Sequence, residues 1–344
     1  MKAWSEIQEE VIEACKQSGD LDTLLAKVSQ ARNQYTTYDS LQKVWKRWGL
    51  PSITEVLGTN IRFTVPKDVV PPKEPDSTYY VNQKTPASLT IIPDIHFPTH
   101  SPTALAAVIA FLRDIKPERV VQLGDAYDMY SISSFPRAPE RVFSFGATIH
   151  QEVQSAKEFW TELLGISKSV DFLPGNHEQR IERLIQANIG LFGHPNFELR
   201  SILEIPEAIV VHDYGAKLRI GNCVITHGDR LLNVKGAPIY LAKKVLEKYP
   251  HQNTFLGHFH TIDIRRSVTY DVYDQAATHM AACIGHLSDT KKQTYISDPN
   301  WMHGFAHLEF WQEGGKDRFT VHIIEIVNGS FMFAGQKYDG RRLM

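Results

Sequence analysis

The chain has 344 residues, of which 37 are Lys or Arg and 39 are Asp or Glu, so its formal net charge is −2. This balance excludes a global positive field, and any affinity for a polyanion must come from a local patch or from bound cations. The first residues are acidic and amphipathic, and no stretch has the roughly 20 consecutive apolar residues that span a bilayer. We therefore expect a cytoplasmic protein without a membrane partner.

Residues 1–57 are predicted to form a small unit of three helices. Apolar residues recur there at helical spacing until a Gly-Leu-Pro stop signal. The stretch 21–48 has the organisation of a helix-turn-helix, and its last helix carries Lys43, Lys46 and Arg47. Two interpretations stay open, because Lys and Arg on an exposed helix face are common. The unit either binds DNA or is a packed helical cap with a solvated basic face.

Residues 58–87 are polar and proline-rich, which predicts a linker or an extended arm. Residues 88–344 are predicted to form one α/β domain, because short apolar strands alternate there with helices. Such a β-α-β-α-β order predicts a largely parallel sheet that is covered by helices. The expected strands are 88–93, 119–123 and 170–173, and the expected helices are 103–115, 150–164 and 178–188.

A hairpin is expected over residues 217–226, because Gly221-Asn222 is typical of a two-residue turn between antiparallel strands. Three apolar runs later in the chain predict further strands. They cover residues 254–256, 307–311 and 319–326.

Five short segments each place a metal-binding side chain where a strand is expected to end. In open α/β sheets, side chains from separate strands meet beyond the carboxyl ends of the strands. Mixed carboxylate, imidazole and amide ligands suit Mn, Fe or Zn, and two such cations about 3.5–4 Å apart favour phosphate ester hydrolysis. The segments are Asp94-Ile-His96, Gly124-Asp125-Ala-Tyr-Asp128, Gly175-Asn176-His177-Glu178, Thr226-His227-Gly228-Asp229 and Gly257-His258-Phe-His260.

In this order, the segments resemble the signature of the calcineurin-like metallophosphoesterase family, which is DxH, GDxxD, GNH(E/D), a downstream His and GHxH. The resemblance covers roughly residues 88–262, and the phage- and prophage-associated branch is most similar. It implies a four-layer α-β-β-α sandwich and two divalent cations, with Mn favoured and Fe, Zn or Ni as alternatives. If a phage encodes the chain, it implies the host cytoplasm. The implied ligands are Asp94, His96 and His260 for the first metal, Asp125 as the bridge, and Asn176, His227 and His258 for the second.

The resemblance also suggests catalytic roles for two further residues. We expect His177 to bind a phosphoryl oxygen and to protonate the leaving alkoxide, with Asp128 orienting its ring. Serine/threonine protein phosphatases of this superfamily continue GDxxD with Arg-Gly, whereas Met129-Tyr130 follows here, which disfavours a protein phosphatase. Three side chains near the motifs are candidate substrate contacts, each with the alternative of an ordinary surface or turn residue: Arg137, Arg180 and His303.

These patterns favour a metal-dependent phosphodiesterase or nuclease whose substrate is a phosphate ester, with DNA and RNA as the expected polymers. One alternative within the enzymes is a phosphomonoesterase that acts on nucleotides or phosphoproteins. An alternative from another class is a DNA-binding module in which residues 1–57 recognise DNA and the phosphoesterase fold is a scaffold.

Overall fold

The structure is a computed structural model that describes residues 4–17, 21–32, 38–50, 53, 80–133, 148–188, 195–231, 239–270, 276–292 and 300–343. Contacts between Cα atoms divide the chain into two compact units, Met1–Lys73 and Glu74–Met344. No helix in these described ranges is long and apolar enough to cross a membrane.

The first unit contains the short helix η1 (Trp4–Glu6) and the helices α1 (Gln8–Gln17), α2 (Leu21–Arg32) and α3 (Tyr38–Arg47). Apolar residues at helical spacing face one another, because burying that stripe stabilises an amphipathic helix. α3 buries Leu41, Val44 and Trp45. Its three basic side chains, Lys43, Lys46 and Arg47, are exposed. The buried cluster comprises Ile7, Val11, Cys15, Leu24, Val28, Leu41, Trp45 and Ile53.

One six-stranded sheet of the second unit contains the expected β-α-β-α-β region. β2 (Ser88–Ile92), β3 (Arg119–Gln122), β4 (Ser169–Phe172) and β5 (Ile209–Val211) run parallel. The hairpin of β11 (Gly304–Glu313) and β12 (Lys316–Glu325) continues the sheet antiparallel to β2, in the order β12-β11-β2-β3-β4-β5. The helices α5 (Pro102–Ile115) and α7 (Ile149–Ile166) pack on its outer face.

Local sequence explains where α5 begins and ends. The hydroxyl oxygen of Ser101 accepts the backbone N–H of Ala104, and Pro102 occupies the first turn, where its missing N–H costs nothing. The helix ends at Lys116, whose left-handed backbone lets its N–H bond the carbonyl oxygen of Leu112. The apolar face between these ends packs onto the sheet.

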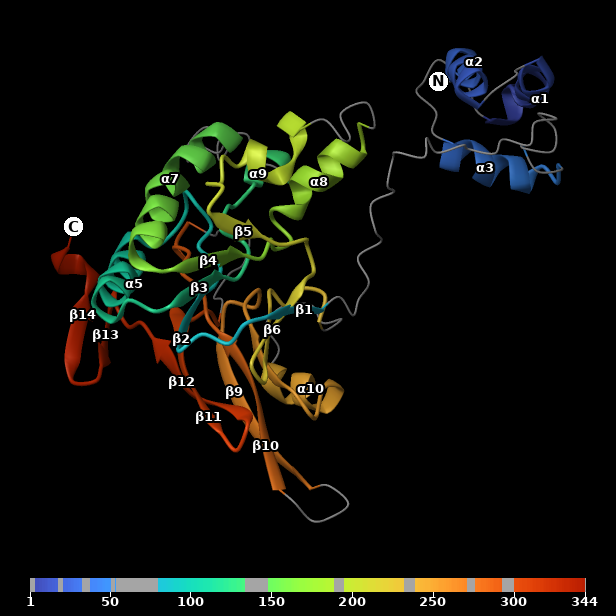
Figure 1. Cartoon of the computed structure of the whole chain (residues 1–344). Coiled ribbons are helices and arrows are strands. Elements are labelled where there is room, and N and C mark those ends of the chain that lie inside the picture. Colours follow the sequence, from blue (N-terminus) through green and yellow to red (C-terminus); the bar gives the residue numbers. More distant parts are fainter. Residues whose placement is uncertain are drawn as a thin grey trace. The chain divides into compact units, whose positions relative to one another are not determined.

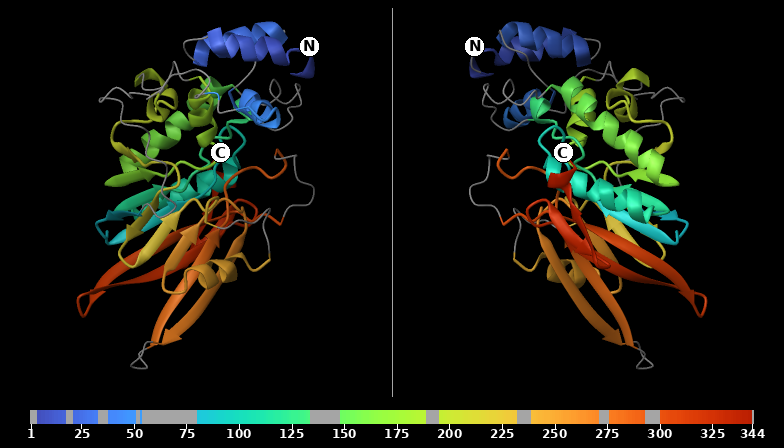
Figure 2. Two further views of the ribbon diagram at one scale, coloured as in Figure 1. Left: turned by 90° about the vertical axis from the view of Figure 1, so that its right-hand side faces the viewer. Right: turned by 90° about the vertical axis from the view of Figure 1, so that its left-hand side faces the viewer.

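The second sheet has the order β1-β6-β7-β8-β10-β9. It contains the expected hairpin, now β6 (Lys217–Ile220) and β7 (Cys223–Thr226), and β8 (Asn253–Leu256). The sequence analysis did not predict β9 (Ile262–Tyr270), β10 (Ala276–Ile284) or the helix α10 (Leu241–Lys248), which covers the outer face of this sheet. Figure 2 shows β9 and β10 extending as a long hairpin away from α5 and α7.

β1 (Tyr80–Gln83) lies within residues 58–87, which were expected to form a linker or an extended arm. It forms an edge strand that pairs parallel with β6. Four residues are too few to show a strand periodicity, and the strand exists because of pairing with residues that lie more than 130 positions later. The part of the predicted linker from 58 to 79 lies outside the described residues.

The two sheets pack face to face, and a core of apolar side chains lies between them. Leu89, Ile91 and Val121 of one sheet join Leu218 and Phe255 of the other in this core. Since α5 and α7 cover one outer face and α10 covers the other, the second unit is a four-layer α-β-β-α sandwich (Figure 1). The predicted α/β fold class is confirmed.

Smaller elements complete the second unit. The helices are α8 (Gln179–Gln186) and α9 (Leu199–Ile202), with the short η2 (Tyr130–Ile132), η4 (Pro195–Phe197) and η5 (Gly340–Arg342), and the small hairpin is β13 (Ser330–Phe333) with β14 (Gln336–Asp339).

Candidate metal centre

The metal-binding motifs lie directly after β2, β3, β4, β7 and β8, at the carboxyl ends of parallel strands. Their loops turn so sharply that several residues other than glycine adopt a left-handed backbone, which costs about 1–3 kcal/mol each and is concentrated at functional sites. Their φ angles lie between 35° and 65° for Asp94, His96, Asp125, Met129, His258 and His260.

A first group of candidate ligands consists of Asp94, His96 and His260, whose ligand atoms lie within 4.8 Å of one another. The Nε2 atoms of His96 and His260 are 3.2 Å apart, and Nε2 of His260 lies 3.4 Å from Oδ1 of Asp94. All three side chains are buried. The structure therefore brings together three residues from two motifs that are more than 160 positions apart.

A second group consists of Asp125, His227 and His258. Nε2 of His227 lies 3.3 Å from Oδ2 of Asp125 and 3.2 Å from Oδ1 of Asn176. Asn176 thus lies beside this group.

Asp125 is positioned between the two groups. Its Oδ2 lies 3.3 Å from Nε2 of His227 in one group and 3.9 Å from Nε2 of His96 in the other. Its other carboxylate oxygen, Oδ1, accepts the backbone N–H of His177 at 3.0 Å. One carboxylate therefore reaches both groups, which is the geometry that a bridging ligand needs.

The hydrogen bonds of the ring Nδ1 atoms test whether these side chains fit a cation. Nδ1 of His96 lies 3.2 Å from a carboxylate oxygen of Asp128, and Nδ1 of His227 lies 2.7 Å from the carbonyl oxygen of Leu123. Because both partners accept hydrogen bonds, each ring can donate Nδ1–H to its partner, which leaves an Nε2 lone pair available to a cation in the cluster. Lone pairs that converge with carboxylate oxygens fit a divalent cation such as Mn, Fe or Zn.

Glycine is required where the loops approach these carboxylates. A Cβ at Gly257 would collide with Oδ2 of Asp94, and a Cβ at Gly175 would collide with Oδ1 of Asp125 and lie 2.7 Å from its backbone nitrogen. Close packing of the ligand loops therefore depends on the absence of a side chain at these two positions.

His177 and Asp128 form a third candidate group with His96, whose ligand atoms lie within 4.8 Å of one another. Nδ1 of His177 donates to the carbonyl oxygen of Asp128 at 2.6 Å and lies 3.3 Å from its carboxylate, while Nε2 lies 3.9 Å from Oδ2 of Asp125. Burial alone would raise the pKa of Asp128. Hydrogen bonds from the His177 and His96 side chains outweigh the effect of burial and lower this pKa. The His177 ring is thus held with Nε2 directed toward the cluster.

The candidate substrate contacts have different surroundings. Arg180 donates to the carbonyl oxygens of Asp128 at 2.8 Å and Met129 at 3.3 Å, so its guanidinium braces the motif loop. His303 donates from Nε2 to the carbonyl oxygen of Ser288 at 2.8 Å, and its ring lies 4.8 Å from that of His286. Arg137 lies outside the described residues.

Sequence reasoning assigned no role to two buried residues of the centre. Glu178 accepts backbone N–H groups from the loops after β3 and β4. His286 follows β10, whose carboxyl end lies beside that of β8, and its ring stacks on His260. The order strand, glycine, histidine recurs in Ile284-Gly285-His286 as in Leu256-Gly257-His258. That repetition is the signal that would have identified His286.

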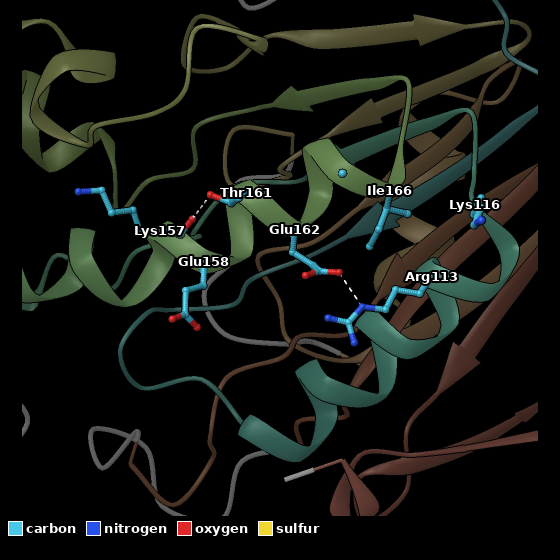
Figure 3. Close-up of a pocket in the computed structure, with 8 residues that line it drawn as sticks. Arg113, Lys116, Lys157, Glu158, Thr161, Glu162 and Ile166 are labelled. Carbon is cyan, nitrogen blue, oxygen red and sulfur yellow. Dashed lines mark hydrogen bonds and ion pairs between the residues drawn. The ribbon is translucent and has the colours of Figure 1, made fainter.

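A groove of about 760 Å³ between α5 and α7 lies apart from these motifs and contains none of their residues (Figure 3). Arg113 donates to Glu162 at 2.6 Å within the groove, and Lys157 lies 2.8 Å from Glu204, which does not line it.

No family model matches the chain. The chain is 24% identical over 260 residues to the Gene 54 protein of Mycobacterium phage L5, which covers 73% of this chain and 98% of that protein. Among solved structures, it is similar to a single mutant of Vps29 from Entamoeba histolytica and to Vacuolar Protein Sorting 29 from Cryptosporidium parvum. Both have 12% identity and a TM-score of 0.33. The match to the first covers 68% of this chain and 98% of that chain, and the match to the second covers 69% of this chain and 97% of that chain. The fold assignment rests on the two sheets described above.

Proposed function

We propose that this chain is a member of the calcineurin-like metallophosphoesterases and acts as a two-metal-dependent phosphodiesterase on nucleic acid. The observation that carries the proposal is the position of Asp125, whose Oδ2 lies 3.3 Å from Nε2 of His227 and 3.9 Å from Nε2 of His96. Asp94, His96 and His260 would hold one cation, Asn176, His227 and His258 would hold the other, and Asp125 would be a ligand of both. Mixed carboxylate, amide and imidazole ligands suit Mn, Fe or Zn, and the family resemblance favours Mn among them.

When bound, the two cations supply positive charge to the phosphoryl oxygens and lower the pKa of a water that attacks phosphorus. The protein must then supply a proton to the leaving alkoxide, which is a poor leaving group when unprotonated. Nε2 of His177 is directed toward the cluster and is suited to this transfer. Asp128 keeps the His177 ring in that orientation through its carbonyl oxygen at 2.6 Å and its carboxylate at 3.3 Å.

Two features favour diesters over monoesters. A monoester phosphate carries an additional charge, which an arginine fork binds well. The residue after the GDxxD motif is Met129, which is fully buried and donates its backbone N–H to Glu152 at 2.7 Å. The nearby guanidinium of Arg180 is bound to backbone carbonyl oxygens.

The surface of the first unit supports nucleic acid as the polymer. α3 exposes Lys43, Lys46 and Arg47 on one face, whereas the exposed side of α1 is rich in glutamate. This patch is local, because the formal net charge of the whole chain is −2. Lysine and arginine side chains bind backbone phosphates and make the affinity depend on salt.

A panel of substrates tests the proposal. With Mn²⁺, the protein is expected to hydrolyse bis-p-nitrophenyl phosphate and DNA or RNA faster than p-nitrophenyl phosphate. Asp125→Asn should abolish each reaction and retain the fold. Hydrolysis of monoesters alone would favour the rival phosphomonoesterase, and inactivity on every diester would reject the proposal.

The alternative of a DNA-binding scaffold makes a separate prediction about α3. Binding of the full chain to duplex DNA should weaken steeply with salt, and Lys43→Gln/Lys46→Gln/Arg47→Gln should reduce the slope by roughly one for each lost phosphate contact. Salt-dependent binding without hydrolysis of any ester would favour the scaffold. Both binding and hydrolysis are expected if α3 serves the phosphodiesterase.

A further inference from the structure

The four imidazoles of the candidate centre differ in how their second ring nitrogen is held. Metal-binding histidines nearly always donate this nitrogen to a carboxylate, a carbonyl or water, which fixes the plane of the ring. His96 and His227 follow this rule, with Nδ1 partners at 3.2 Å and 2.7 Å. Nδ1 of His258 and Nδ1 of His260 are buried and have no hydrogen-bond partner among the described residues, and only His260 has a second imidazole stacked on its ring there. Another contact must orient the His260 ring.

Two aromatic rings pack against the His260 ring. The His286 ring lies nearly parallel to it, with centroids 4.7 Å apart and an interplanar angle of 10°. The Trp301 indole meets the His260 ring at 70°, with centroids 4.5 Å apart. A parallel neighbour at van der Waals distance opposes tilting of a planar ring, and an edge contact opposes rotation within the plane.

His286 is itself fixed firmly enough to orient another residue. Its side chain is fully buried, and its Nδ1 accepts the backbone N–H of Ser288 at 3.2 Å and lies 2.7 Å from the Ser288 hydroxyl oxygen. The backbone N–H of His286 donates to the carbonyl oxygen of Met302 at 3.1 Å, and its own carbonyl oxygen accepts the backbone N–H of Gly304 at 3.1 Å. Because Nδ1 accepts an N–H, the ring is neutral and carries its proton on Nε2.

The preceding glycine belongs to the same arrangement. Gly285 has a φ of +88°, and a Cβ at that position would lie 2.6 Å from the carbonyl oxygen of Met302. The backbone of His286 can therefore approach the strand that begins at Gly304 only because residue 285 has no side chain. This approach places the His286 ring against His260.

We propose that His286 is a positioning residue that sets the plane of the His260 ring by stacking, in place of the missing hydrogen bond. The inference rests on the proposed function, because it assumes that His260 binds a cation through Nε2. His286 itself is fully buried and contacts neither substrate nor cation in this proposal. Its effect therefore appears first in metal affinity.

The test compares two substitutions of similar size. His286→Phe retains a planar ring and loses the bond to Ser288, whereas His286→Leu fills the space without a ring. Mn²⁺ binding to the metal-free full-length protein is measured by isothermal titration calorimetry, and thermal unfolding is recorded for each variant. We expect His286→Leu to weaken Mn²⁺ binding by about 10-fold or more, and His286→Phe to remain close to wild type.

His307→Ala is the matched control. His307 is equally buried, and its Nδ1 lies 2.9 Å from the Thr90 hydroxyl oxygen, but it lies in the core beside Phe111. Its loss should lower the temperature of unfolding and leave Mn²⁺ affinity unchanged. A decrease in affinity that simply followed lost stability would appear in this variant too, and would contradict a positioning role for His286.

The remaining outcomes separate this inference from the proposed function. Equal Mn²⁺ affinity of His286→Leu and wild type would overturn the inference alone, and so would an equal loss in the Phe and Leu variants. Absence of Mn²⁺ binding to the wild-type protein would overturn both proposals. If His286→Leu does not fold, His286→Ala takes its place in the same comparison with the Phe variant.

Discussion

The buried carboxylate of Glu178 accepts the backbone N–H of Asp125 at 3.0 Å, although the two residues lie on loops that follow different strands. The same side chain accepts the N–H groups of Gly175 at 2.7 Å and Tyr127 at 3.0 Å. One carboxylate therefore ties the loop after β3 to the loop after β4. The position of the proposed bridging ligand depends on this link.

Glu178→Gln should destabilise the protein and the metal centre together. The amide nitrogen of glutamine cannot accept an N–H, so at least one of the three backbone donors would be left buried without a partner. The expected loss in the free energy of unfolding is about 1–3 kcal/mol, measured by urea denaturation, with weaker Mn²⁺ binding. Glu207→Gln, at an exposed position, should change neither quantity. Unchanged stability of Glu178→Gln would contradict the role of this carboxylate.

His177→Asn should reveal whether His177 protonates the leaving group. A general acid contributes about 10²–10⁴-fold to a rate when the leaving group is a poor one. We expect kcat for a dinucleotide, which releases an alkoxide, to fall by that range. The loss for bis-p-nitrophenyl phosphate should be much smaller, because p-nitrophenolate leaves without a proton. Equal losses on the two substrates would assign His177 to another task.

Gly257→Ala should disrupt the first group of ligands, because the added Cβ would collide with the carboxylate of Asp94. Mn²⁺ affinity should fall and hydrolysis with it. Gly165→Ala is the matched control, since a Cβ there meets nothing within 4 Å and the residue lies near the end of α7. The control should stabilise the protein by about 0.5–1 kcal/mol. Calorimetric titration of both variants with Mn²⁺ provides the comparison.

Asp171 should contribute stability that depends on pH. Its carboxylate accepts two bonds from Arg119, both at 2.7 Å, and lies 2.7 Å from Nε2 of His212. Burial alone would raise the pKa of Asp171, but His212 and Arg119 outweigh burial and hold it below its usual value. The contribution is therefore fully present above the unfolded-state pKa of about 3.9 and is lost as pH falls through the folded-state pKa.

Asp171→Asn removes the charge and leaves Arg119 buried beside a neutral amide. Removing one partner of a buried ion pair destabilises a protein by about 3–5 kcal/mol. The free energy of unfolding at pH 7 should fall by a similar amount. The difference between variant and wild type should shrink as the pH is lowered below 4. Urea denaturation at several pH values measures both, and a difference independent of pH would refute the assigned ionisation.

The motif loops were predictable because each combines an apolar run, a small residue and a ligand within a few positions, as in Gly124-Asp125. The central parallel strands followed from the same alternation of strands and helices. These features are local, so periodicity and turn chemistry identify them.

The contacts of Glu178 and the strand β1 were not predictable, because both depend on distant partners. The carboxylate of Glu178 binds N–H groups more than 50 positions earlier in the chain. β1 exists because it pairs with β6. Sequence spacing indicates which residues can follow a strand, but not which loops then lie side by side.

The number and coupling of the bound cations test the central claim most directly. Electron paramagnetic resonance of the protein titrated with Mn²⁺ should show two ions per chain and the spectrum of a spin-coupled pair, and Asp125→Asn should lose that coupling. A single isolated Mn²⁺ at saturation in the wild-type protein, or a coupled pair that persists in Asp125→Asn, would contradict a centre bridged by Asp125.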